Sequence, residues 1–163
     1  MVTTTDNIKY GASTAITPFT IASQPSSATA GRSCPAIDNG TNLFDDVLLT
    51  ITVKTSASAL ANDKACYVYV YGSEDGTTYN ASSAEGVGTD VGITLDAPTN
   101  LKGPLVISCP ASSVTYRGEW SIAQLFGGVL PRKWGVVLQN YTGQALDASV
   151  GSASYTGITF TNS

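Results

Sequence analysis

The sequence contains no histidine, and charged residues make up only 12% of its 163 residues. Histidine is the side chain whose pKa lies nearest neutrality. Its absence excludes Ser-His-Asp and Cys-His catalysis and removes the imidazole ligands of most zinc and copper sites. Eight Lys and Arg against twelve Asp and Glu give a formal net charge of −4. Because nucleic acids are bound by concentrated positive charge, we expect no nucleic-acid partner.

Long apolar runs are also missing. A membrane-spanning helix needs about 20 consecutive apolar residues, and the sequence contains no such run, so we expect no membrane partner. The first residues, MVTTTDNIKYGAST, do not place an apolar stretch after a basic one, as a secretory signal does. We therefore expect synthesis and folding in the reducing cytoplasm of a cell.

The cysteines form neither a disulfide framework nor a metal-binding motif. Cys34, Cys66 and Cys109 are odd in number and widely spaced, whereas frameworks use even sets and metal sites use CxxC pairs. Cys66 and Cys109 stand in apolar runs, where a cysteine behaves as a small hydrophobic residue. We expect free, buried or half-buried thiols; one pair closing across two strands is the alternative.

The length and the hydrophobic content of 42% fit one domain with one core. The polar residues 1–14 indicate an extended N-terminal arm, and residues 15–163 a single β-sandwich domain. Within that domain, residues 23–42 show no periodicity and contain two Pro and two Gly, which predicts a long loop. Loops of that length are usually functional or become ordered against a partner.

Alternation of apolar and polar residues is the main structural signal. Leu49, Ile51 and Val53 alternate with polar residues, as in a half-buried strand. Strands without intervening helices predict an all-β fold, an antiparallel β-sandwich with jelly-roll-like or immunoglobulin-like wiring, roughly eight strands and very little helix. The expected strands are 15–21, 49–53, 66–71, 93–95, 105–109, 114–122, 134–139 and 155–160, and residues 77–79 can continue the strand at 66–71 as its returning partner. One helical turn is expected at 122–126, ending at Gly127.

Three tyrosines in one strand are candidate partner contacts. Tyr67, Tyr69 and Tyr71 alternate with valines, so they share one face of the strand. Aromatic residues are common in strands, where they pack against cross-strand neighbours. They are also enriched in interfaces, and a tyrosine row can stack on sugar rings. All three interpretations remain open at this point.

A second candidate contact is the pair Arg132 and Lys133, the one place where two positive charges adjoin, beside Trp134. A cation–π contact or a salt bridge to an acidic partner is one interpretation. A strand entrance with solvated charges is the other.

The positions of the carboxylates indicate neither a catalytic site nor a metal site. Most lie in turns, where Asp usually forms local hydrogen bonds, so we expect no catalytic residues. Residues 38–46 supply oxygen ligands suited to calcium, but they lack the spacing of an EF-hand loop. We therefore predict no metal site and no cofactor.

Several phrases of the sequence resemble small structural proteins from the particles of tailed bacteriophages. They are DNIKYGASTAITPFTIASQPSSATAGRSC, YVYVYGSEDGTTY, FGGVLPRKWGVVLQNYTG and SYTGITFTN. The nearest class is the capsid cement, or decoration, proteins. The resemblance covers most of the chain but contains no catalytic signature, so no functional residue is carried over with it.

The resemblance implies a non-enzymatic β-sandwich on the surface of the phage head that stabilises the shell by bridging capsid subunits. Its partners would be the major capsid protein and further copies of itself, with a trimer expected. Residues 1–14 and 23–42 would contact the capsid. The alternatives are a receptor- or carbohydrate-binding module of a tail fibre or spike, and a structural component of the tail or of the head–tail junction.

Overall fold

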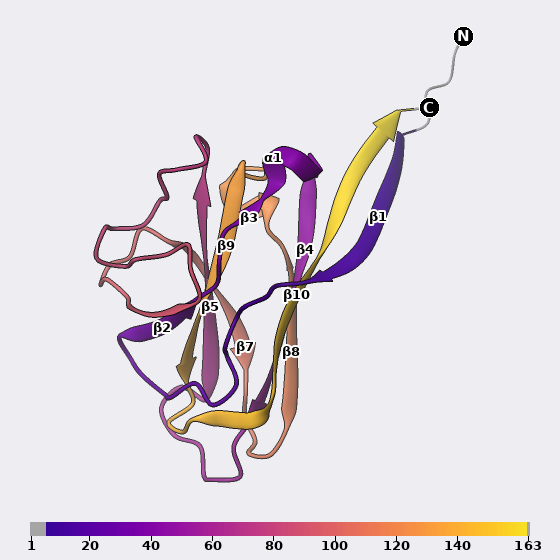
Figure 1. Ribbon diagram of the computed structural model, residues 1–163. Helices are drawn as coiled ribbons and strands as arrows, with labels where there is room; N and C mark the ends of the chain where they lie inside the picture. Colours follow the sequence, from indigo (N-terminus) through magenta and orange to yellow (C-terminus); the bar gives the residue numbers. More distant parts are fainter. Residues whose placement is uncertain (1–5, 163) are drawn as a thin grey trace.

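Two antiparallel β-sheets lie face to face in the computed structural model, which describes residues 6–162 (Figure 1). The four-stranded sheet has the order β1-β10-β4-β8, formed by Asp6–Ala15, Leu146–Asn162, Asp46–Thr55 and Thr115–Ser121. The six-stranded sheet has the order β6-β2-β9-β5-β7, formed by Val91–Thr94, Ala30–Ser33, Lys133–Tyr141, Ala65–Ser73 and Lys102–Ser108. The short β3 (Ile37–Asp38) also pairs with β9. The all-β sandwich expected from the sequence is confirmed; its jelly-roll wiring stays a prediction.

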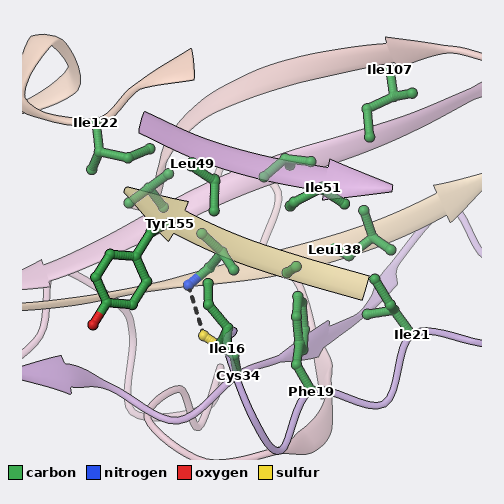
Figure 2. Packing of buried hydrophobic residues seen from close by; sticks show 14 of the residues in the cluster. Ile16, Phe19, Ile21, Cys34, Leu49, Ile51, Ile107, Ile122, Leu138 and Tyr155 are labelled. Atoms are coloured by element: carbon green, nitrogen blue, oxygen red, sulfur yellow. Dashed lines mark hydrogen bonds between the residues drawn. The ribbon is translucent and has the colours of Figure 1, made fainter. Parts of the chain in front are cut away.

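The core lies between the two sheets and follows the alternation seen in the sequence. On β4, Leu49, Ile51 and Val53 are fully buried, because the intervening polar residues point to the outer face. Val68 on β5 and Leu138 on β9 face them from the six-stranded sheet. Figure 2 shows part of this cluster at close range.

The N-terminal region departs from the expectation. The structure has a strand at Asp6–Ala15, inside the segment expected to be an arm, and none at 15–21 beyond Ala15. Residues 1–5 of the expected arm lie outside the described residues. Ile16, Phe19 and Ile21 are nevertheless buried, and their side chains point into the core from an irregular segment (Figure 2). Pro18 has no N–H to donate to a neighbouring strand, so this segment buries its apolar side chains without forming a strand.

The segment 23–42, predicted to be a loop, contains short regular elements. These are β2, β3 and the helical turn α1 (Asn39–Asn42). Asp38 caps that turn by accepting the Gly40 N–H at 2.7 Å. The helical turn predicted at 122–126 is confirmed as the 3-10 helix η1 (Ala123–Phe126), which ends at Gly127 in the left-handed conformation.

The outer face of the six-stranded sheet is covered at one end by residues 74–101. The expected strand at 77–79 is absent, and instead of a hairpin the chain makes an excursion that carries β6. A second apolar cluster lies beneath it, made of Tyr71, Ile93, Leu95, Leu101 and Val137. The fully buried carboxylate of Glu85 links two parts of residues 74–101 by hydrogen bonds. It accepts the Ser82 N–H at 3.0 Å and the Thr99 hydroxyl at 2.6 Å.

The three cysteines are free and buried, as the sequence predicted. Burial raises the pKa of the Cys34 thiol to about 11. Cys66 and Cys109 lie in the main core, and the neighbouring Cys109 thiol, together with burial, raises the pKa of Cys66.

Candidate contact surfaces

The tyrosine row does not form one surface. Tyr71 is fully buried under the 74–101 excursion. Its hydroxyl donates to the Cys34 carbonyl at 2.6 Å, and its ring packs edge-on against Tyr79 at 5.1 Å between centroids. Burial, the largest cause, raises the pKa of the Tyr71 phenol. The prediction that Tyr71 is a contact residue is inconsistent with this burial, because a separate chain segment covers that end of the sheet.

Tyr67 and Tyr69 lie at the other end of β5, on the uncovered part of the outer face. The strand register puts Val106 of β7 directly opposite Tyr67, and Tyr141 of β9 opposite Ala65. Directly paired residues point to the same side of a sheet, so these side chains share one face. We call Tyr67, Tyr69, Val106 and Tyr141 the tyrosine platform. Val106 is 51% exposed, and the tyrosines are half-buried.

Hydrogen bonds hold the platform tyrosines in place. Tyr67 donates to the Asp63 carboxylate at 2.5 Å, which raises the pKa of the Tyr67 phenol to about 12. Tyr69 donates to the Gln139 amide oxygen at 3.3 Å, and burial raises its pKa. The Tyr67 and Tyr141 rings lie 6.5 Å apart at an angle of 36°. The platform is thus a pre-ordered aromatic patch with a polar margin.

Arg132 and Lys133 lie far along the sheet from the platform. In the register of β5 with β9, Lys133 pairs with Ser73, eight positions along β5 from Ala65, which pairs with Tyr141. Arg132 is exposed, and its side chain lies over Gly40 and Gly76. Trp134 is buried in the core, edge-on to Tyr155 at 5.5 Å. The five predicted contact residues therefore do not converge on one site.

A third surface is formed by β1 and the end of β10, which run out together beyond the sandwich as a two-stranded ribbon (Figure 1). Ile8 is paired with Phe160, and Tyr10 with Ile158. Ile8, Tyr10 and Phe160 are 56%, 64% and 57% exposed. These residues were not predicted from the sequence, although Ile8 and Tyr10 alternate with polar residues around Lys9, as in a strand.

A hollow of about 650 Å³ lies between the turn after β5 and η1. Its apolar lining comes from Leu125, Phe126, Val129 and Pro131, and its polar lining includes Glu74, Asp75 and Lys102. Val129 is 72% exposed. The Asp75 carboxylate is occupied within the turn, where it accepts the Thr77 and Thr78 N–H groups at 2.7 Å. These hydrogen bonds hold the pKa of Asp75 well below its usual range.

The carboxylates of residues 38–46 serve the chain itself. Asp45 accepts the Phe160 N–H at 2.7 Å, and Asp46 accepts the Ser121 hydroxyl at 2.6 Å and the Ala123 N–H at 2.8 Å. Within residues 6–162 no group of three metal-ligating His, Cys, Asp or Glu side chains occurs. In the same part of the chain, no helix has the length and apolar character to cross a membrane.

Comparison with known proteins finds no matching family model, no similar curated protein and no similar solved structure.

Proposed function

We propose that this protein is a non-enzymatic structural component of a tailed-bacteriophage particle, a capsid cement protein that stabilises the head by bridging capsid subunits. It would be made in the bacterial cytoplasm and act on the capsid surface. The resemblance of its sequence to small phage structural proteins supports the proposal, and so does its two-sheet fold.

The observation that carries the proposal is the exposure of apolar side chains on two separate parts of one small sandwich. The tyrosine platform lies on the six-stranded sheet, whereas the ribbon leaves the four-stranded sheet. Contiguous exposed apolar patches usually mark interaction sites. Two such patches suit a protein that bridges neighbours, because several weak contacts made together give tight retention.

We assign the capsid contact to the tyrosine platform. Tyrosines that are already held by hydrogen bonds lose little conformational freedom on binding. Arg132 and Lys133 would add a separate ionic contact. The expectation that residues 1–14 and 23–42 reach the capsid stays a prediction.

The test is binding of the purified protein to phage heads that lack it, measured by co-sedimentation. We expect the double variant Tyr67→Ser, Val106→Ser to bind at least about tenfold more weakly, while Val114→Ser binds as wild type. Val114 is the matched control because it is an exposed valine at the entrance of β8 in the other sheet. Bound protein should also raise the temperature at which the heads release DNA.

Moderate salt should release little protein, because apolar burial rather than screened charge pairs makes the contact. Failure of the wild-type protein to bind heads, or its release by moderate salt alone, would contradict the assignment. Deletion of residues 1–14 is a poor probe, because it removes most of β1, which pairs with β10 from Asp6 to Ala15. Point substitutions on the ribbon should be tested in place of the deletion.

A second candidate function is a receptor- or carbohydrate-binding module of a tail fibre or spike, or another structural part of the tail. The platform favours sugar binding, since exposed tyrosine rings stack on sugars and the Asp63 carboxylate lies at its margin. Electron cryomicroscopy of intact particles distinguishes the candidates: density over the whole head supports cement, and density at the tail supports the alternatives. Glycan binding that Tyr67→Ser abolishes would favour the carbohydrate module.

A further inference from the structure

Two of the three buried cysteines lie close together on neighbouring strands. Cys66 of β5 is paired with Ile107 of β7, and Cys109 stands two positions beyond Ile107, just after the end of β7. Alternate residues of a strand point to the same face, and both cysteines are fully buried in the core between the sheets. The Cys109 N–H donates to the Lys64 carbonyl at 2.8 Å, which holds Cys109 beside the start of β5.

The two thiols influence each other's protonation. The neighbouring Cys109 thiol raises the pKa of Cys66, and burial adds to this effect. The neighbouring Cys66 thiol lowers the pKa of Cys109. When one proton leaves the pair, it therefore leaves Cys109. Because the thiolate and not the thiol is the nucleophile in cysteine oxidation, Cys109 has the more reactive sulfur of the two.

Cys34 lies apart from this pair. Its N–H donates to the carbonyl of Val136 on β9. Val136 is four positions along β9 from Asn140, the residue that pairs with Cys66, and four positions of a strand span about 13 Å. The Cys34 thiol accepts the Val136 N–H at 3.2 Å. The chain therefore contains one pair of neighbouring thiols and one separate thiol that serves as an internal control.

Cys109 also lies at a place where the core opens most easily. β7 is the edge strand of the six-stranded sheet, paired with β5 alone. Cys109 follows its last residue, and the adjoining Ser108 and Pro110 are exposed. Local opening of such an end costs far less free energy than unfolding the whole domain. A molecule as small as hydrogen peroxide then reaches Cys109, while Cys66 stays on the inner strand β5.

We propose that Cys66 and Cys109 form an oxidation site, at which hydrogen peroxide converts the two thiols into one intramolecular disulfide. The Cys109 thiolate attacks one oxygen of the peroxide, so that an S–O bond forms and the O–O bond breaks. The leaving hydroxide takes up the proton that Cys109 had lost and departs as water, and Cys109 becomes a sulfenic acid.

The second step closes the bond between the strands. The Cys66 sulfur attacks the Cys109 sulfur, the S–S bond forms, the S–O bond breaks, and a second water leaves with the Cys66 proton. Two thiols are thereby oxidised and one peroxide is reduced to two waters. The strand β7 has a single neighbour in its sheet, so it is free to make the small shift that disulfide geometry requires.

The disulfide would tie the edge strand β7 to β5 and close the part of the chain that contains the 74–101 excursion. A cross-link of this kind restricts the unfolded chain, so the oxidised protein should be the more stable form. This inference goes beyond the proposed function and is independent of it, since its test needs no phage particle.

The first test counts the thiols that remain after the reduced, full-length protein is treated with a small excess of hydrogen peroxide and the reaction is stopped with catalase. The protein is then unfolded without reductant, and its free thiols are alkylated and counted by mass spectrometry. We expect the count to fall from three to one, with a digest fragment that joins Cys66 to Cys109. Three surviving thiols, a disulfide that includes Cys34, or a product that joins two chains would overturn the proposal.

Serine variants assign the roles of the sulfurs, with circular dichroism as the check that each variant folds. Cys34→Ser is the matched control and should lose both of its thiols at the wild-type rate. Cys66→Ser should stop at a Cys109 sulfenic acid, which dimedone traps, and Cys109→Ser should keep both of its thiols. A Cys109→Ser variant that reacts as fast as wild type would contradict the assignment, as would a Cys34→Ser variant that no longer reacts.

Stability gives a second readout that needs no variant. The oxidised protein should unfold at a higher urea concentration than the reduced protein, and dithiothreitol should return the midpoint to the reduced value. An unchanged or lower midpoint after oxidation would mean that the bond does not form within the native sandwich, and it would overturn the proposal.

Discussion

The first half of β10 lies inside the sandwich, and its last residues run out along the ribbon beside β1 (Figure 1). Ala153 and Tyr155 are 6% and 9% exposed and belong to the core, whereas Phe160 on the same strand is 57% exposed. Phe160 stands five positions from Tyr155 and so points to the opposite face of the strand, away from the second sheet. It also lies beyond Ile158, the last residue of β10 that pairs with β4. Continuity of a strand therefore does not imply equal contribution to stability.

A similar division runs along β5. Tyr71 is fully buried beneath the 74–101 excursion, and Tyr67 is half-buried on the platform, although both stand on the same face of one strand. In both strands the buried part belongs to a hydrophobic cluster, whereas the other part leaves large side chains exposed or half-buried. Substitutions in the buried part and in the exposed part of each strand should therefore change the free energy of unfolding by different amounts.

The largest contrast is expected between the core and the ribbon. Leu49→Ala on β4 removes a fully buried side chain and should lower the free energy of unfolding by about 3 kcal/mol. Phe160→Ala should change it by less than about 0.5 kcal/mol in dilute monomer. Urea unfolding at low protein concentration measures both. Comparable losses from the two variants would mean that the ribbon belongs to the folding unit of the sandwich.

A smaller contrast is expected between the two tyrosines. Tyr71→Phe removes the hydrogen bond to the Cys34 carbonyl, which keeps its second donor, the Ser33 hydroxyl at 3.1 Å. The expected cost is about 1 kcal/mol. Tyr67→Phe removes a bond at the surface and should cost close to nothing. Equal effects in thermal unfolding would show that the platform is as much a part of the fold as the buried end of β5.

The smallest effect concerns the hydrogen bonds by which Asp90 holds residues 74–101 to the rest of the protein, and their loss at low pH. The hydrogen bond from Arg32, at 2.6 Å, together with hydrogen bonds from Thr20, lowers the pKa of Asp90 to about 2. Because this pKa lies below the unfolded value of about 3.9, the stabilisation is present above about pH 4 and is lost as the pH falls toward 2. Asp90→Asn should remove this part of the pH dependence of the urea midpoint. An unchanged pH profile would show that Asp90 does not anchor the excursion.

The class of fold was predictable because it rests on local patterns. Alternating residues such as Leu49, Ile51 and Val53 have one face to bury, and a half-buried strand is the conformation that buries it. Gly127 marked the end of η1 for an equally local reason, since the left-handed conformation there favours glycine. The strand at 6–15 was missed because its apolar face is exposed, so Ile8 and Tyr10 read as part of a polar arm.

The candidate sites were less predictable, since they depend on which segments meet. The alternation along β5 placed Tyr67, Tyr69 and Tyr71 on one face of the strand. It could not show that residues 74–101 cover Tyr71 on that face. Tyr141 joined the platform through the pairing of β5 with β9, which are some 70 positions apart in the chain.

The sequence alone therefore determined the all-β class, the strands with a strong alternation such as β4 together with their buried faces, and the free, buried state of the cysteines, because these follow from side-chain polarity at neighbouring positions. The tertiary structure alone decided which apolar residues stay exposed. The uncovered end of β5, the ribbon and the hollow arise where one sheet or segment ends and another does not reach. That outcome depends on the lengths and relative positions of strands and loops far apart in the sequence. The alternation of apolar and polar residues within one segment contains no information about them.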